Sequence, residues 1–135
     1  MIDTLSIAER SERMSRVRSK DTRTEMIVRR LVYGMGFRYR LHDANLPGKP
    51  DMVFRSRRKV IFVHGCFWHR HKNCSLARMP KSRVKFWQEK LNGNRTRDNR
   101  NRRQLEKMGW SVLVVWECEL KGLDALQQKI EQFLG

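Results

Sequence analysis

The 135-residue sequence has no apolar run of membrane-spanning length, and its first residues, MIDTLSIAERSER, lack the apolar core of a secretory signal. These absences argue against an integral membrane protein and an exported one, so we expect a soluble cytoplasmic protein. Cysteine is also scarce, with only three residues. Three thiols cannot all pair as disulfides, and cytoplasmic thiols are usually reduced, so a shared metal ion is the natural reason for them to act together.

Acidic residues are scarce as well. Fourteen Asp and Glu stand against thirty Lys and Arg, which gives a formal net charge of +16. A small domain tolerates this self-repulsion more easily when a polyanion neutralises it, so we expect a nucleic acid as partner. A basic solvated surface, or a ribosomal or heparin-type binder, would carry the same charge. Charge alone therefore names no activity.

The length and apolar content suit one modest core, without repeats or a linker. We expect a basic N-terminal segment, residues 1–20, and a single domain, residues 21–135. The order of elements predicts an α/β fold with a central mixed sheet flanked by helices. Periodicity and turn signals predict, in order, a helix at 22–35, strands at 37–42, 51–55 and 59–64, an irregular insert at 65–80, a helix at 82–108 that Asn92-Gly93-Asn94 breaks or bends, a strand at 110–117 and a helix at 122–134.

The insert contains a metal-ligand pattern. Cys66, His71 and Cys74 follow the spacing Cys-x4-His-x2-Cys, and zinc binds both thiolate and imidazole well. A closed structural site needs a fourth ligand, which Cys118 would supply after the last strand. Spacing alone does not exclude His69 in place of His71. Cysteines that are merely buried or incidental are the alternative, but the use of every cysteine in one Cys3His site favours zinc.

Asp51 follows Pro50 at the start of a β-rich run and is a candidate Mg²⁺ ligand, because a hard cation prefers carboxylate oxygen. Pro-Asp is also common in turns. If residues 56–58 form the turn of a hairpin, Arg55 faces Lys59 and Asp51 faces Val63. The Asp51 carboxylate would then meet the backbone at Val63, whose carbonyl could complete the ion's shell. A slip of one residue would move Asp51 to the opposite face.

Histidines near this hairpin end have the chemistry for phosphodiester hydrolysis. His64 or His69 would act as base or acid near neutral pH. Glu25, on the first helix, would orient one of them. Its alternative role is the capping box with Thr22, and the sequence alone does not choose between the two.

Aromatic residues alternate with basic ones in the same region. Phe67 and Trp68 lie in the segment 66–74, which carries the candidate zinc ligands and which we call the metal loop. Phe86 and Trp87 stand early in a helix rich in Lys and Arg. Aromatic side chains wedge between base steps while basic ones hold phosphates. A core position is the alternative, which is stronger for Phe86 than for the adjacent pair in the loop. Trp110 and Trp116, in or beside the apolar strand, are expected in the core.

Five segments together resemble the very-short-patch-repair (Vsr) endonucleases: RSERMSRVRSKDTRTE, LPGKPDMVF, VIFVHGCFWHRHKNC, FWQEKL and LEKMGWSVLVVWECEL. The match spans about residues 10–122. The resemblance implies a restriction-endonuclease-like fold with structural zinc. It also implies Mg²⁺-dependent nicking of duplex DNA on the 5′ side of the thymine in T:G mismatches, which arise from deamination of 5-methylcytosine. We expect a monomer, with mismatch-repair proteins as further partners.

The resemblance also assigns residues. Val63 stands where well-known members carry Thr, a change that leaves a carbonyl ligand intact. The HRHKNC segment is one residue longer than the matching segment of members with a continuous histidine run. The roles that the resemblance implies are Mg²⁺ binding by Asp51 and the Val63 carbonyl, catalysis by His69 with Glu25 and by His64, zinc binding by Cys66, His71, Cys74 and Cys118, and DNA contact by Phe67, Trp68, Trp87, Arg16, Arg18 and Lys20.

Two other functions share the same sequence features: a nuclease with broader mismatch, lesion or restriction specificity, and a zinc-stabilised DNA-binding module without catalysis.

Overall fold

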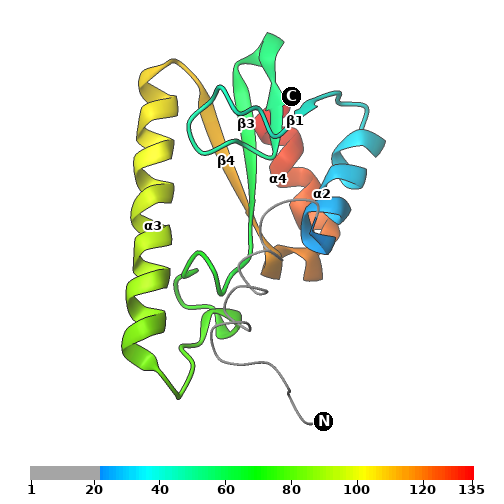
Figure 1. Cartoon of the computed structure of the whole chain (residues 1–135). Coiled ribbons are helices and arrows are strands. Elements are labelled where there is room, and N and C mark those ends of the chain that lie inside the picture. Colours follow the sequence, from blue (N-terminus) through cyan, green and yellow to red (C-terminus); the bar gives the residue numbers. More distant parts are fainter. Residues whose placement is uncertain (1–21) are drawn as a thin grey trace.

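Three α-helices and a four-stranded sheet form the part of the chain that the structure, a computed structural model, describes, residues 22–135 (Figure 1). The N-terminal segment, with the expected DNA contacts Arg16, Arg18 and Lys20, lies outside the described residues. None of the helices in 22–135 is long and apolar enough to cross a membrane. The elements are α2 (Arg23–Gly34), β1 (Arg40–Leu41), β2 (Met52–Phe54), β3 (Lys59–His64), α3 (Val84–Lys107), β4 (Ser111–Trp116) and α4 (Leu123–Leu134), with short 3-10 helices at Arg55–Arg57, Ser75–Ala77 and Glu117–Lys121.

The sheet has the strand order β1-β2-β3-β4 and is mixed. The first three strands pair antiparallel, and β3 pairs parallel with β4. A parallel pair needs a long crossover, which the metal-loop insert and α3 provide. The predicted α/β class with a mixed sheet and flanking helices is therefore confirmed.

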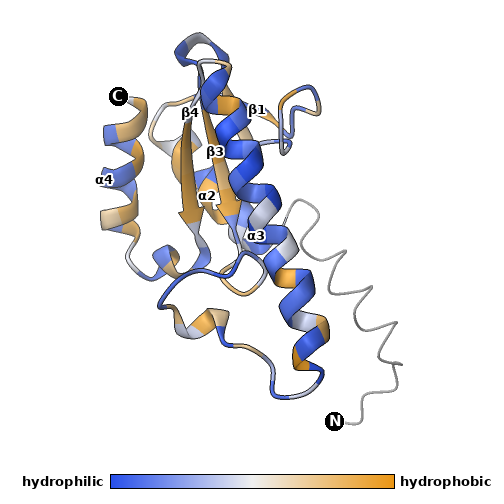
Figure 2. Ribbon diagram, turned by 90° about the vertical axis from the view of Figure 1, so that its left-hand side faces the viewer, coloured by the Kyte–Doolittle hydropathy of each residue, from blue (hydrophilic) through white to orange (hydrophobic). Residues whose placement is uncertain are grey.

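Apolar side chains cover both faces of the sheet. On one face α2 and α4 pack with Val28, Ile61 and Ile130, all fully buried. On the other face Leu105 of α3 packs against Val60, and Trp110 is buried as expected. Figure 2 shows apolar strands beside an α3 that is hydrophilic along most of its length. Helix α3 thus uses few apolar contacts to pack and exposes a long basic surface.

The hairpin register differs from the predicted one. Phe54, rather than Arg55, faces Lys59, because the 3-10 helix Arg55–Arg57 and a left-handed Arg58 (φ 52°) make a four-residue connection. The predicted pairing of Asp51 with Val63 across the hairpin is therefore wrong by one residue. The Asp51 carboxylate nevertheless reaches the backbone expected for it, since its Oδ2 accepts a hydrogen bond from the Val63 amide at 2.6 Å.

Two other elements depart from the prediction. Helix α3 runs unbroken through Asn92-Gly93-Asn94. Buried Asn94 explains part of this continuity, because its Nδ2 donates to the Trp68 carbonyl at 3.1 Å and ties the helix to the metal loop. The strand expected at 37–42 shrinks to Arg40–Leu41, the only stretch there that pairs with β2.

Candidate active site

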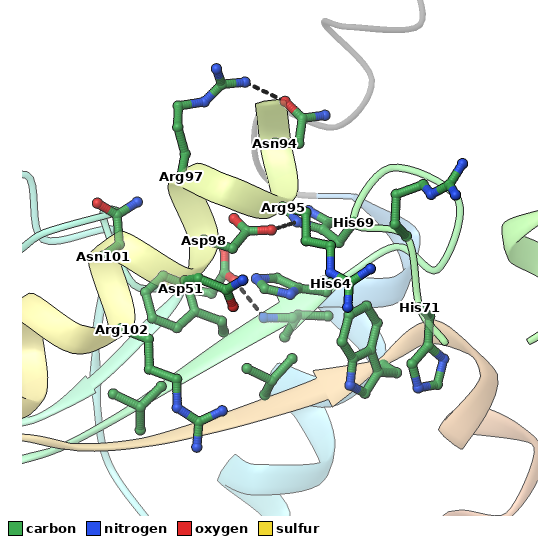
Figure 3. A pocket seen from close by; sticks show the side chains of 18 of the residues that line it. Asp51, His64, His69, His71, Asn94, Arg95, Arg97, Asp98, Asn101 and Arg102 are labelled. Atoms are coloured by element: carbon green, nitrogen blue, oxygen red, sulfur yellow. Dashed lines mark hydrogen bonds and ion pairs between the residues drawn. The ribbon is translucent and has the colours of Figure 1, made fainter. Parts of the chain in front are cut away.

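A cleft of about 630 Å³ opens between α3 and the ends of β2, β3 and β4 (Figure 3). Six Lys and Arg side chains line it against two carboxylates, Asp51 and Asp98. Figure 3 shows Arg95, Asp98 and Arg102 reaching from α3 over the strands. An excess of positive charge around a few carboxylates suits a polyanionic ligand, whose phosphates the cations neutralise. His64 and His69, which were predicted from the sequence, also line this cleft.

Asp51 lies in an environment that disfavours its charge. Burial raises the pKa of Asp51 to about 7; the Val63 amide opposes this shift, and the neighbouring Glu25 carboxylate adds to it. Glu25 is itself buried, with 3% of its surface exposed. The buried Glu25 carboxylate and the half-buried Asp51 carboxylate repel each other, and a bound cation removes that repulsion.

His64 and His69 form a parallel stack. Their ring centroids are 3.8 Å apart and the ring planes differ by 4°. His69 Nδ1 lies 2.5 Å from Asp98 Oδ2, so the α3 carboxylate fixes the orientation of this imidazole. With Nδ1 donating to Asp98, the other nitrogen, Nε2, is left as the one available to exchange a proton.

The expected pairing of Glu25 with His69 is not what the structure shows. Glu25 Oε2 lies 2.8 Å from His42 Nε2 and 3.3 Å from Arg29 Nη1, and the carboxylate against His69 is Asp98. The positions of the helices explain this difference. Helix α2 brings Glu25 to the β1–β2 edge beside Asp51, whereas α3 runs past the metal loop and places Asp98 against His69. One half of the predicted capping box is present, because Thr22 Oγ1 accepts a hydrogen bond from the Glu25 backbone amide.

All three cysteines meet His71 in one cluster. Cys66 Sγ and Cys118 Sγ lie 3.5 and 3.4 Å from His71 Nδ1, and the four ligand atoms, including that of Cys74, are within 4.8 Å of one another. Burial raises the pKa of the Cys66 thiol to about 12, which a cation at the sulfur would reverse. The geometry selects His71 over His69 for this cluster. Left-handed Arg70 (φ 53°) and Asn73 (φ 54°) turn the HRHKNC loop so that the ligands converge.

The expected DNA-contacting aromatics also come together. The Phe67 ring is 5.1 Å from Trp68 and 5.5 Å from Trp87, and the two tryptophans are 6.0 Å apart, all edge to face. We call these three residues the aromatic cluster. Each is half-buried, so neither pure burial nor full exposure describes them. Trp116, expected in the core, is also half-buried and stacks on His71 at 4.0 Å.

Two residues at this site were missed by sequence reasoning. Asp98 is the one acid within the basic run Arg95–Arg103, and that isolation was an available signal. His42 left no comparable signal, because only the pairing of β1 with β2 brings it near Asp51.

The mixed sheet, the basic cleft and an acid–histidine centre are the features expected of an enzyme that cleaves phosphodiesters in nucleic acid. Residues 2–76 match the family model described as DNA mismatch endonuclease Vsr. The chain belongs to the Vsr family and is a DNA endonuclease.

Similar proteins cover nearly the whole chain. The type II nicking enzyme V.XorIIP of Xanthomonas oryzae pv. oryzae is 50% identical over 134 residues, which are 99% of this chain and 98% of that protein. The DNA mismatch endonuclease Vsr of Escherichia coli K12 is 42% identical over 139 residues, 99% of this chain and 88% of that protein. The type II nicking enzyme V.NmeAIP of Neisseria meningitidis is 41% identical, covering 99% and 95%.

Proposed function

We propose that the enzyme nicks one strand of duplex DNA on the 5′ side of the thymine in a T:G mismatch, with Mg²⁺ as catalytic ion. The observation that carries the proposal is the meeting of Asp51 with the stacked His64–His69 pair and Asp98 in one basic cleft. The mismatch endonuclease name of the Escherichia coli relative and the nicking names of the other two support it. Restriction-endonuclease-like topology is part of the same proposal.

The carboxylates at the cleft suit Mg²⁺. Half-buried Asp51 and buried Glu25 hold carboxylate oxygens close together, where desolvation and then the repulsion between the two groups raise the pKa of Asp51. We assign Asp51 and the backbone carbonyl of Val63 to the ion. A bound Mg²⁺ would supply charge stabilisation for the phosphate under attack.

The cysteine cluster suits zinc. Tetrahedral zinc with Zn–S and Zn–N bonds of about 2.3 and 2.0 Å separates a sulfur ligand from a nitrogen ligand by about 3.5 Å. The two Sγ–Nδ1 distances in the cluster, 3.5 and 3.4 Å, agree with this separation. We assign structural zinc to Cys66, His71, Cys74 and Cys118, where it would hold the insert against the end of β4.

Proton transfer falls to His69 in this proposal. Asp98 holds Nδ1, so Nε2 takes a proton from the attacking water or gives one to the leaving oxygen. His64, stacked on His69, keeps the ring plane fixed and assists at the phosphate. Arg95 and Arg102 on α3 line the cleft where the DNA backbone would pass.

The aromatic cluster would detect the mismatch. Inserting a ring between base pairs costs a few kcal/mol of unstacking, and less at a mispaired step. The rings of Phe67, Trp68 and Trp87 form one apolar unit beside the cleft, with Lys90 Nζ 5.7 Å from the Trp68 ring centre. A basic residue next to an inserted aromatic ring would contact the DNA phosphate beside the unstacked base pairs.

A duplex panel with matched variants tests the proposal. The substrates carry T:G in several contexts, other mismatches or none, and nicking is mapped with and without Mg²⁺. Asp51→Ala should abolish nicking while mismatch binding persists, and Asp124→Ala, an exposed acid on α4, should match the wild type. Full activity of Asp51→Ala would refute the assigned centre.

The same panel separates the other two functions. Equal cleavage of matched and mismatched duplexes would point to a nuclease with broader specificity. Binding without Mg²⁺-dependent cleavage of any duplex would point to a zinc-stabilised binding module. The monomeric state and the mismatch-repair partners stay predictions.

A further inference from the structure

His42 lies at the edge of the cleft, against both carboxylates of the proposed Mg²⁺ site. Its Nε2 is 2.8 Å from Glu25 Oε2 and 3.8 Å from Asp51 Oδ1. The three side chains come from three parts of the chain: Glu25 from the first turn of α2, His42 from directly after β1 and Asp51 from directly before β2. Their ligand atoms all lie within 4.8 Å of one another. The cluster therefore combines two carboxylates with one imidazole.

Strand pairing explains how His42 arrives there. The β1–β2 register pairs Arg40 with Val53 and Leu41 with Met52, so His42 comes opposite Asp51. The His42 amide donates to the Asp51 carbonyl at 3.4 Å, although His42 itself has a left-handed backbone (φ 47°). Directly opposite residues in antiparallel strands bring their side chains together. His42 and Asp51 are thus neighbours by construction of the sheet edge.

The carboxylate atoms are also arranged for a shared ion. The Val63 amide occupies Asp51 Oδ2, which leaves Oδ1 as the oxygen nearer His42. Ligands bound at about 2.1 Å in an octahedral shell lie about 3 Å apart in adjacent positions and about 4.2 Å apart in opposite ones. The 2.8 Å spacing of His42 Nε2 from Glu25 Oε2 is close to the adjacent separation, and its 3.8 Å spacing from Asp51 Oδ1 lies between the two values.

We infer that His42 Nε2 is a direct ligand of the active-site ion and raises the affinity of the site for first-row transition ions such as Mn²⁺ more than its affinity for Mg²⁺. Carboxylate, carbonyl and water ligands suit both Mg²⁺ and Mn²⁺, whereas imidazole suits transition ions, whose affinities for nitrogen ligands are lowest for Mn²⁺ and rise along the first row. Ligation needs the Nε2 lone pair, so the ring proton moves to Nδ1 by exchange with solvent. The inference rests on the proposed function, because it takes an ion at Asp51 as given.

The competing explanation is that His42 only holds Glu25 through a hydrogen bond. His42→Gln separates the two, because Gln keeps an N–H donor and loses the imidazole nitrogen. The zinc-loaded full-length protein is titrated with Mn²⁺ by calorimetry, and Mg²⁺ affinity is measured by competition. We expect His42→Gln to lower Mn²⁺ affinity by about tenfold or more and Mg²⁺ affinity by much less. An unchanged Mn²⁺-to-Mg²⁺ affinity ratio would overturn the inference.

A spectroscopic measurement gives a second, independent answer. Pulsed electron paramagnetic resonance of bound Mn²⁺ should show coupling to a directly bound ¹⁴N in the wild type, retained in His69→Gln and lost in His42→Gln. Absence of this coupling in the wild type overturns the inference even if His42→Gln fails to fold. Asp51→Asn tests the underlying site: if it binds both ions as the wild type does, the proposed Mg²⁺ site fails. If Asp51→Asn loses ion binding and the wild type shows no nitrogen coupling, the proposed ion site stands and only the assignment of His42 as a ligand is rejected.

Discussion

The charge on Asp51 should destabilise the fold when no divalent cation is bound. Its pKa is raised from 3.8 to about 7, first by burial, so the folded state favours the protonated carboxyl. A raised acid pKa contributes stability at low pH that disappears as the pH rises through about 7. Each pKa unit corresponds to about 1.4 kcal/mol. Since pH 6 is one unit below this pKa, protonation of Asp51 raises the free energy of unfolding at pH 6 by about 1.4 kcal/mol relative to the ionised group, and at pH 8 it adds almost nothing.

Asp51→Asn isolates this contribution, because the amide is neutral at both pH values and its oxygen can still accept from the Val63 amide. In urea unfolding with zinc present and Mg²⁺ absent, the variant should be more stable than the wild type at pH 8. Its advantage should shrink by about 1.4 kcal/mol at pH 6. Asp124→Asn, at an exposed acid, should show no such change between the two pH values. An Asp51→Asn advantage that is the same at pH 6 and pH 8 would refute the reasoning.

Three further outcomes follow from the contacts of the metal loop. Cys118→Ser should leave the chain short of its full zinc content and lower its melting temperature, as measured by metal analysis and calorimetry; full zinc occupancy would exclude Cys118 as a ligand. Asp98→Asn should slow nicking by about a hundredfold with DNA binding intact in single-turnover assays, and wild-type rates would remove Asp98 from His69 positioning. Asn94→Ala should lower the free energy of unfolding by about 1–3 kcal/mol, because it leaves the Trp68 carbonyl without this donor, whereas exposed Asn92→Ala should not.

Local patterns predicted the elements well where one face is consistently apolar. Alternation and β-rich composition placed β3 and β4 almost to the residue, and ligand types in the insert predicted the Cys66–Cys118 cluster. The connection between β2 and β3 was harder. The residues between the two strands are compatible both with the predicted three-residue turn and with the observed 3-10 turn that ends in left-handed Arg58. The two turns give strand registers that differ by one residue. Sequence pattern does not distinguish them, because the strand β2 is buried along its whole length and lacks alternation.

Contacts between side chains far apart in the sequence were harder still to predict. The pairing of His69 with Asp98 depends on how α3 lies across the sheet, and nothing local to either residue encodes that crossing. Glu25 was matched to the wrong histidine for the same reason, since its distance along the chain from His42 and from His69 carries no geometric information. Helix α3 also continues through Gly93, where propensity predicts a break or a bend, and the buried tertiary hydrogen bond of Asn94 explains part of this continuity.

The metal loop explains why one short segment serves three tasks. His69 and His71 are two residues apart, and left-handed Arg70 between them lets one ring face Asp98 while the other faces the thiols. Phe67 and Trp68 precede them and join Trp87 of α3. The loop is fixed at two independent places, by the cysteine cluster near β4 and by Asn94 on α3. Release of either anchor should therefore displace His69, the proposed proton-transfer residue, together with the aromatic cluster. Under the proposed function, this arrangement would couple detection of a mispaired base step to the placement of His69.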